Sequence, residues 1–203
     1  MNIDFSTLSG KEIYGAMIQT IVPRPVAWVL SDNGDKTLNL APFSYFNGVS
    51  SKPPTLSLSI GHKRAGEKKD TWRNIDERSR FVVHIAGVDH AQLVSATSEA
   101  LEFRDSEVTK QSIELIDEDG FALPRIKDAQ IAFDCEKYQI IEIGDAPQGL
   151  VIGKINRVYV DDAITQRTEG GFKVDALTLN PLSRLGGDDY AQLGEILTIP
   201  RPY

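Results

Sequence analysis

A succession of strand-like segments joined by hairpin-length connections constrains the fold of this chain more than any other feature. The run Asp32-Asn33-Gly34-Asp35 predicts a hairpin turn, because Asn-Gly tolerates positive φ. This turn pairs a strand over residues 26–30 with a strand over residues 37–47. Pro23 and Pro25 cannot donate to a sheet ladder, so the first of these strands begins at a sheet edge.

The next segment, residues 55–61, alternates leucine and isoleucine with threonine and serine, which predicts one core face and one hydroxyl face. Further strands are predicted over residues 80–85, 130–143 and 150–160, the last two joined by the turn 144–149. Parallel strands need long crossovers. The short connections therefore favour an antiparallel barrel, mainly β with peripheral helices, over a doubly wound sheet.

Peripheral helices are predicted at three places. The first spans residues 10–19 with Ser9 as its cap, and the second is capped by Asp70 or Thr71 and ends near residue 78. Trp72 and Ile75 of the second helix are expected to face the core. The third opens at the capping-box spacing of residues 89–92 and ends near residue 97. Residues 98–127 are charged and irregular, and residues 1–203 are expected to form one domain.

The charge balance excludes two classes of partner. The 203-residue chain carries 22 Lys and Arg against 29 Asp and Glu, a formal net charge of −7. Nucleic acids require a basic surface stripe, and anionic membranes attract cations, so neither partner is expected. Any local cluster of cations is correspondingly informative.

Cysteine content and the N-terminus indicate a cytoplasmic protein. Cys135 is the single cysteine, which excludes an intramolecular disulfide and a cysteine-rich metal site. Residues 1–5 lack the basic and nonpolar regions of a signal peptide, and no nonpolar run approaches about 20 residues. Neither secretion nor membrane insertion is expected.

Conventional catalytic signals do not occur in the chain. His62, His84 and His90 lack the spacing of a zinc site, and no GxSxG, Walker or GxGxxG pattern is present. Cys135 lies within a predicted strand, where a buried core residue is more common than a nucleophile. If the chain is an enzyme, its reactive group is imported, and no side chain is assigned as catalytic.

A cationic loop that opens a helix is the better candidate site. Helix N-termini present unpaired N–H groups, and they bind phosphate when lysine and hydroxyl side chains are added. Lys69 and Thr71 flank such a terminus, and Ser57, Ser59 and Gly61 lie at the end of the preceding strand. An ordinary solvated loop with a helix cap fits the pattern equally well. The side chains of the loop that can carry positive charge are His62, Lys63, Arg64, Lys68 and Lys69.

The segment Asn39–Asn47 is polar for a core strand. Its aromatic residues Phe43, Tyr45 and Phe46 are more typical of the core of a small barrel than of cofactor contacts. The segment is nevertheless followed by the hydroxyl-bearing strand, the lysines and the helix N-terminus. This order is typical of a site for a flat ring that bears a phosphate.

Several co-linear motifs carry a resemblance. They are Pro23-Arg24-Pro25-Val26-Ala27-Trp28-Val29, Asn39-Leu40-Ala41-Pro42-Phe43-Ser44-Tyr45-Phe46-Asn47, Pro53 through Gly61, and Lys69-Asp70-Thr71-Trp72-Arg73-Asn74-Ile75. Together they resemble the flavin reductase-like family of FMN-binding split barrels, which includes flavoredoxin. Ala96-Thr97-Ser98, Gly149-Leu150-Val151-Ile152-Gly153 and Arg184-Leu185-Gly186-Gly187 with Tyr190 extend the similarity to nearly the whole chain.

The resemblance implies a homodimeric split β-barrel that holds FMN non-covalently near the subunit interface. Residues 41–47 would line the isoalloxazine ring, largely through backbone groups. The end of the next strand and the helix start would hold the phosphate, and Arg24 would close the site. Residues 98–105, where relatives differ, give no indication of the substrate. The residues implied for the cofactor site are Arg24, Asn39, Ala41, Pro42, Ser44, Tyr45, Phe46, Asn47, Ser59, Ile60, Gly61, Lys69, Asp70 and Thr71.

The implied cofactor determines the implied chemistry. A flavin accepts hydride and passes electrons onward singly or in pairs, while the protein binds and orients it. The resemblance thus implies an oxidoreductase that uses NAD(P)H or a protein donor. Two other functions stay open, namely a flavin-binding carrier or electron relay without NAD(P)H turnover, and a barrel for protein interaction only. The donor, the acceptor and the choice between NADH and NADPH stay open as well.

Overall fold

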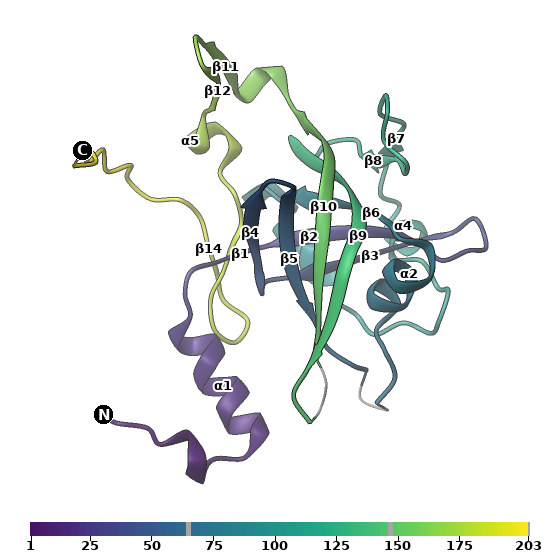
Figure 1. Cartoon of the computed structure of the whole chain (residues 1–203), viewed down its shortest axis with the longest axis vertical. Coiled ribbons are helices and arrows are strands. Elements are labelled where there is room, and N and C mark those ends of the chain that lie inside the picture. The colour runs from purple at the N-terminus through teal and green to yellow at the C-terminus, as the bar shows by residue number, and fades with distance from the viewer. Residues whose placement is uncertain (64–65, 146–147, 203) are drawn as a thin grey trace.

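The computed structural model describes residues 1–63, 66–145 and 148–202, and a seven-stranded sheet is its largest element (Figure 1). All neighbouring strands in this sheet are antiparallel, as expected from the short connections. The mainly β fold with peripheral helices is confirmed. The strand order is β3 (Leu38–Phe43), β2 (Ala27–Asp32), β6 (Arg80–Ile85), β9 (Ile131–Ile143), β10 (Gln148–Val160), β5 (Pro54–Ile60) and β4 (Phe46–Ser51).

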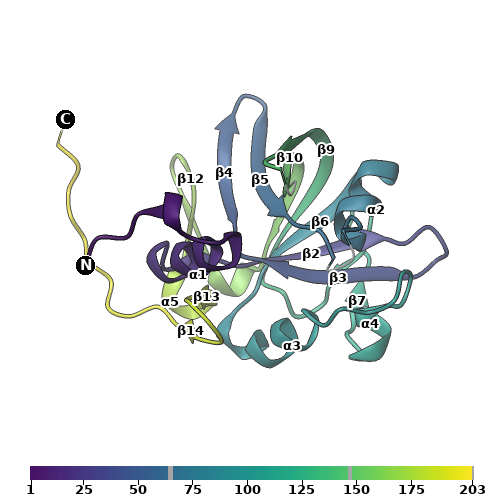
Figure 2. The ribbon, with the colours of Figure 1, turned by 90° about the horizontal axis from the view of Figure 1, so that it is seen from below.

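Strands β3 and β4 lie at opposite edges of the sheet, although only Ser44 and Tyr45 separate them in the chain. In Figure 2 the β4–β5 hairpin rises away from β3. Across the described residues the two edges do not pair, so the sheets are not closed into a barrel. The closure that the predicted split barrel requires is therefore not observed, and the predicted continuous strand 37–47 is divided in two.

Helix α4 (Glu107–Lys110) explains why β4 does not pair with β3. The hydroxyl of Ser106 donates to the carbonyl of Leu38 at 2.6 Å, and the carboxylate of Glu107 accepts from the N–H of Leu40 at 3.0 Å. Side chains thus occupy polar groups on the outer edge of β3. An edge protected in this way is not available to another strand.

Alternation along the strands divides the core between the two faces of the sheet. In β2, Ala27 and Val29 belong to one buried cluster, and Trp28 and Leu30 belong to the other. Helix α2 (Asp70–Arg78) packs into the first cluster through Trp72 and Ile75, which are fully buried as predicted. The core thereby fixes the start of α2 beside β3.

The helix termini agree with the sequence in one case and differ in two. Ser9 caps α1 (Gly10–Thr20) in a capping box with Glu12, as the sequence indicates. In α2 the N-cap position is Lys69 and no side chain caps the helix, so the predicted cap at Asp70 or Thr71 is wrong. The third predicted helix is a 3-10 turn, η2 (Val88–His90), followed by α3 (Ala91–Ala96), and neither has a side-chain cap.

Residues 98–127, predicted as irregular, contain α4 and a short ladder of two strands. Residues 146–147 of the predicted turn 144–149 and Arg64 of the predicted cationic loop lie outside the described residues. No helix in the described ranges is long and nonpolar enough to cross a membrane. The remaining elements are η1 (Phe5–Thr7), β1 (Arg24–Pro25), β7 (Leu115–Ile116), β8 (Arg125–Ile126), η3 (Asp162–Ile164), β11 (Thr165–Thr168), β12 (Gly171–Val174), α5 (Ala176–Leu179), β13 (Ser183–Arg184) and β14 (Tyr190–Ala191).

Candidate functional site

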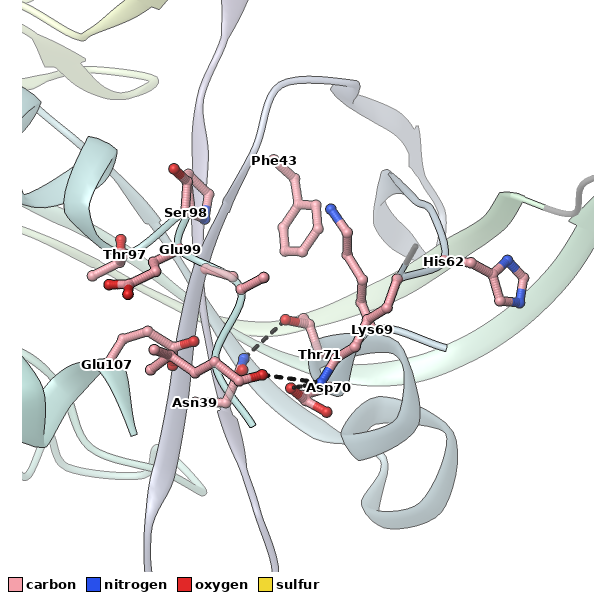
Figure 3. A pocket seen from close by; sticks show the side chains of 15 residues that line it. Asn39, Phe43, His62, Lys69, Asp70, Thr71, Thr97, Ser98, Glu99 and Glu107 are labelled. Atoms are coloured by element: carbon pink, nitrogen blue, oxygen red, sulfur yellow. Dashed lines mark hydrogen bonds and ion pairs between the residues drawn. The ribbon is translucent and has the colours of Figure 1, made fainter. Parts of the chain in front are cut away.

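A pocket of about 660 Å³ opens between β3, the start of α2 and the segment after α3 (Figure 3). Its volume falls within the roughly 300–1,000 Å³ of small-molecule and cofactor sites. Residues 97–101 and Glu107 form one side, which we call the loop wall, and His62 and Lys63 complete the lining. The opposite side, which we call the strand wall, consists of Asn39, Ala41, Pro42 and Phe43 of β3 with Lys69, Asp70 and Thr71 of the α2 start.

The start of α2 has the properties of an anion site. Because no side chain among the described residues caps the helix, its first N–H groups keep their capacity to bind a ligand. The helix dipole adds a partial positive charge at the same point. The negative charge of Asp70 at the first helical position is balanced by Lys63, whose ammonium lies 2.8 Å from Oδ2.

Lys69 supplies the available cation on the strand wall. Its ammonium lies 5.8 Å from the centroid of the Phe43 ring. Desolvation in these surroundings lowers the pKa of Lys69. Within the described ranges no carboxylate forms an ion pair with it, in contrast to Lys63. A partly desolvated cation without a counter-ion favours an anionic ligand.

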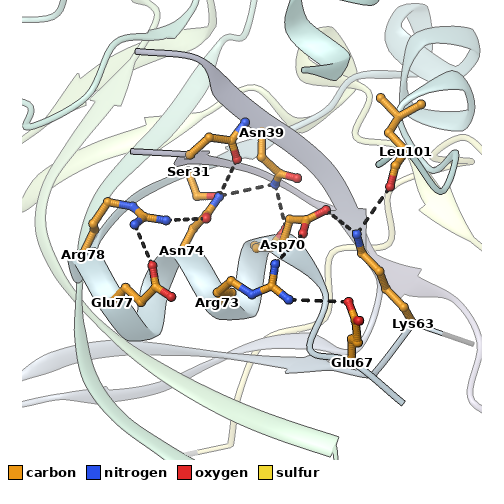
Figure 4. Close-up of polar contacts among 12 residues, drawn as sticks. Ser31, Asn39, Lys63, Glu67, Asp70, Arg73, Asn74, Glu77, Arg78 and Leu101 are labelled. Atoms are coloured by element: carbon orange, nitrogen blue, oxygen red, sulfur yellow. Dashed lines mark hydrogen bonds and ion pairs between the residues drawn. The ribbon is translucent and has the colours of Figure 1, made fainter. Parts of the chain in front are cut away.

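A buried hydrogen-bond network holds the strand wall together (Figure 4). The amide nitrogen of Asn39 donates to Thr71 Oγ1 at 2.9 Å and to Ser31 Oγ at 3.3 Å. The amide nitrogen of Asn74 donates to the same Ser31 hydroxyl at 3.1 Å and to Asn33 at 2.9 Å. These residues are at most 3% exposed, so the network links α2 to both strands of the β2–β3 hairpin away from water.

The loop wall is fastened by fewer and more exposed contacts. The ammonium of Lys63 donates to the carbonyl of Leu101 at 3.3 Å. The guanidinium of Arg73 lies 4.2 Å from the centroid of the Phe103 ring, and that ring is 38% exposed. Residues 98–100 are exposed throughout. Lys110 also pairs with Glu99 at 2.7 Å, so three cationic side chains hold the outer part of this wall.

At its base, the loop wall is joined to the core through Thr97. Trp28 Nε1 donates to Thr97 Oγ1 at 2.8 Å, and the carbonyl of Trp28 lies 2.9 Å from Nδ1 of His84. Nε2 of His84 accepts from the N–H of Ile126 at 3.0 Å, so the proton of the neutral ring belongs on Nδ1. Burial lowers the pKa of His84 to about 4.

Glu107 is the buried acid of the loop wall. It is 6% exposed, and its Oε2 accepts the Leu40 N–H. Burial raises the pKa of Glu107, and the negative charge of Asp70 adds to this, while the Leu40 hydrogen bond and Lys63 oppose it. A carboxyl group is thereby placed inside the pocket in an environment that favours its protonated form.

The pocket unites only part of the residue set implied by the resemblance. The set is divided because the chain leaves β3 after Phe43 and continues as β4 at the opposite edge of the sheet. Pocket-lining members are Asn39, Ala41, Pro42, Lys69, Asp70 and Thr71. Members outside the pocket are Arg24, Ser44, Tyr45, Phe46, Asn47, Ser59, Ile60 and Gly61, whose contact with a cofactor stays a prediction.

Arg24 has a different environment from the one expected. Its guanidinium is 4% exposed and donates to the carbonyls of Ile18, Ile21 and Leu185 at 2.6–2.7 Å and to Ser44 Oγ at 3.3 Å. These bonds use both terminal nitrogens. In the observed arrangement Arg24 fastens α1 and the β13 region to the β3–β4 junction.

The end of β5 lies outside the pocket and packs against its neighbours. Ile60 is fully buried in the core, and the N–H of Ser59 donates to the Tyr45 carbonyl at 2.9 Å. A Cβ atom at Gly61 would lie 3.0 Å from Gln148 Oε1, so the missing side chain leaves room for Gln148. The small residue there serves packing between β5 and β10.

Sequence reasoning missed the loop wall as a functional surface. Thr97 and Ser98 entered only through the resemblance, and Glu107 gave no signal, because it stands in a charged stretch that reads as solvent-exposed. The described residues contain no cluster of three or more His, Cys, Asp or Glu able to hold a metal ion. Cys135 is buried, as expected, and burial raises the pKa of its thiol.

Comparison with known proteins identifies relatives over almost the whole chain. A family model described as "Flavin reductase like domain" matches residues 19–174. The chain is 36% identical to the uncharacterized protein YwrF of Bacillus subtilis over 200 residues, covering 96% of both chains. It is 32% identical to the uncharacterized protein BH2278 of Halalkalibacterium halodurans, covering 100% of this chain and 97% of the relative.

Two solved structures are similar in both fold and sequence. Nitrilotriacetate monooxygenase component B from Bacillus cereus has a TM-score of 0.90 and 35% identity, covering 98% of each chain. The 2-nitrobenzoate 2-nitroreductase NbaA of Pseudomonas fluorescens has a TM-score of 0.88 and 29% identity, covering 100% of this chain and 96% of that one. Flavoredoxin of Desulfovibrio vulgaris, at 19% identity and a TM-score of 0.75, shares the fold.

Proposed function

We propose that this chain, which belongs to the flavin reductase-like family, is an oxidoreductase that binds FMN non-covalently and is reduced by NAD(P)H or by a protein donor. The observation that carries the proposal is Lys69, a cation without a counter-ion in the described ranges, at the uncapped start of a helix that borders a cofactor-sized pocket.

The residues of the strand wall fit such a cofactor. Lys69, Thr71 and the first N–H groups of α2 would hold the phosphate, and residues 41–43 would border the ring. When bound, the flavin supplies hydride and electron transfer. The protein binds and orients it, and the buried Asn39–Thr71 hydrogen bond keeps the two halves of the strand wall in register.

Relatives support a reductase over a binding protein without turnover. Two similar structures are named as a nitroreductase and as a monooxygenase component. The alternative is a flavin-binding carrier or electron relay, which would use the same pocket without reacting with NAD(P)H. A cytoplasmic location belongs to the proposal and is supported by the single buried cysteine.

We also propose a homodimer. Helix α1 has no buried residue, and five of the six residues of β4, from Asn47 to Ser51, are exposed. Near the C-terminus Ile196, Leu197 and Ile199 are 54%, 77% and 79% exposed. Nonpolar surface and an open sheet edge of this kind favour a two-fold partner. A purely monomeric protein at micromolar concentration in sedimentation would contradict this part.

Cofactor content tests the flavin assignment directly. Purified protein is expected to take up FMN and to show the absorbance of bound flavin. A colourless protein that does not bind added FMN would remove both the reductase and the carrier. Anaerobic mixing with NADH and with NADPH then separates these two, because a reductase bleaches at a rate that saturates with one donor.

Lys69→Ala tests the phosphate end. It is expected to weaken FMN binding by roughly 1–3 kcal/mol, because it deletes a charged hydrogen bond. Riboflavin lacks the phosphate, so its weaker binding should be nearly indifferent to the substitution, as measured by fluorescence titration. Lys68→Ala is the matched control, since Lys68 pairs with Asp76 and Glu142 outside the pocket. Equal losses in both variants would place the phosphate elsewhere.

A further inference from the structure

Glu107 differs from the other acids of the pocket in having no charged partner. Asp70 is paired with Lys63 at 2.8 Å, and Glu99 is paired with Lys110 at 2.7 Å. Across the described residues no cation lies within ion-pair distance of Glu107, and Leu40 is the only other residue that donates a hydrogen bond to it. The Leu40 N–H donates to Oε2 of Glu107. The other oxygen, Oε1, accepts no hydrogen bond from another described residue, and the carboxyl group lines the pocket (Figure 3).

The two hydroxyl groups of the loop wall and the histidine of the pocket are engaged elsewhere. The hydroxyl of Thr97 donates to the Val94 carbonyl at 3.2 Å, and that of Ser98 donates to the Ser95 carbonyl at 2.6 Å. In Figure 3 the His62 ring points away from the other labelled side chains, and it packs edge-on against Trp72 at 4.9 Å. Among the polar groups facing the pocket, Glu107 is therefore the acid best able to exchange a proton with a ligand.

The surroundings of Glu107 favour its protonated form. Burial makes the largest contribution to the raised pKa, and Asp70, across the pocket at the start of α2, adds to it. Lys63 opposes the shift from the same side. Lys110 on α4 is engaged by Glu99. A ligand that displaces water from the pocket would increase the desolvation further.

We propose that Glu107 is the proton donor of this pocket, serving a small organic acceptor that takes up a proton together with an electron pair, such as a quinone. This inference rests on the proposed function, which supplies the electrons, and it names the class of acceptor. A one-electron protein partner would not require a buried acid in the pocket. The loop wall is thus the acceptor side of the pocket.

The transfer balances in atoms and charge. If a reduced flavin bound here gave a hydride to a quinone, the flavin would be oxidised by two electrons and the quinone would carry one negative charge on oxygen. The O–H bond of Glu107 breaks and a new O–H bond forms on this oxygen, which yields the neutral hydroquinone. Glu107 becomes a carboxylate and recovers its proton from water at the exposed residues 98–100.

Glu107→Gln separates proton transfer from structure. The amide oxygen of glutamine accepts the Leu40 N–H as the carboxylate does, but the amide side chain does not donate a proton as a general acid. Glu114→Gln is the matched control, because Glu114 is an exposed acid paired with Lys127 at 2.7 Å. Reduced FMN-loaded proteins are mixed anaerobically with 2-methyl-1,4-naphthoquinone or with ferricyanide, which takes electrons without a proton.

We expect Glu107→Gln to slow reoxidation by the quinone about 100-fold or more, and to leave reoxidation by ferricyanide unchanged. An equal loss with both acceptors, or none with either, overturns the inference and leaves the proposed function intact. Failure of the wild-type chain to bind FMN overturns both. In FMN-free protein, an infrared band of a protonated carboxyl should titrate above the usual glutamate range and vanish in Glu107→Gln alone, and its persistence also overturns the inference.

Discussion

The two walls of the pocket are built in different ways. The strand wall combines an edge strand with a helix start, and Asn39, Thr71 and Asn74 join them through buried hydrogen bonds. The loop wall is irregular and exposed over residues 98–100, and three cationic side chains, Lys63, Arg73 and Lys110, fasten its outer part. The strand wall is organised by the core, whereas the outer part of the loop wall is organised by surface contacts.

Because of this difference, we expect the strand wall to be rigid and the outer part of the loop wall to be adaptable. A buried polar network with its hydrogen bonds satisfied fixes one geometry, which suits a cofactor whose ring must be oriented. Exposed contacts such as Arg73 with Phe103 each contribute little to stability and are easily rearranged. We infer that the strand wall determines what is bound permanently, and that the loop wall adapts to what reacts.

The largest effect is expected from Asn74→Ala, in the buried network that holds the strand wall. Asn74 is fully buried, donates to Ser31 and Asn33 and accepts from Arg78 Nη2 at 2.6 Å. Removing it leaves buried partners unsatisfied, and the free energy of unfolding should fall by roughly 3–5 kcal/mol. Urea unfolding measures this change. A loss under about 1 kcal/mol would mean that the network does not organise this wall.

Acid should loosen the base of the loop wall through His84. In the unfolded chain the His84 ring binds a proton below about pH 6.5, whereas in the folded protein the buried ring stays neutral until about pH 4. The contribution of His84 to the free energy of unfolding is therefore fully present above pH 6.5. It is lost as the pH falls from about 6.5 to about 4, by an amount on the order of 3 kcal/mol.

Urea unfolding at a series of pH values checks the His84 prediction. His84→Gln should be less stable at neutral pH and should lose less stability on acidification. His62→Asn is the matched control, because His62 lies at the pocket and is not fully buried. A wild-type stability that is flat across this interval, or a His84→Gln variant with the same acid response, would contradict the prediction.

The smallest effect is expected from Phe103→Ala, just after the loop-wall residues 97–101. Its ring is partly exposed and contacts Arg73, so the free energy of unfolding should fall by less than about 1 kcal/mol. The matched substitution in the strand wall is Phe43→Ala, where the ring is 7% exposed and a loss of about 3–5 kcal/mol is expected. Similar losses at both positions would remove the distinction between the walls.

Local patterns predicted much of the fold. Alternation over residues 55–61 identified β5, and nonpolar spacing identified α2 with Trp72 and Ile75 in the core. The division of residues 37–47 escaped prediction, because nothing within that segment reveals that α4 occupies its outer edge. The short elements in residues 98–127 escaped for a related reason, since their few residues are held by long-range contacts.

Motifs and periodicity, which are properties of neighbouring residues, were enough to identify the family, the antiparallel strands and the helix start at Lys69 and Thr71 that lines the pocket. Tertiary structure alone decided that the sheet stays open and that the loop wall faces β3. It also decided that Glu107 lies buried in the pocket, bonded to Leu40. A charged residue in a polar stretch reads as solvent-exposed until the fold removes water from around it.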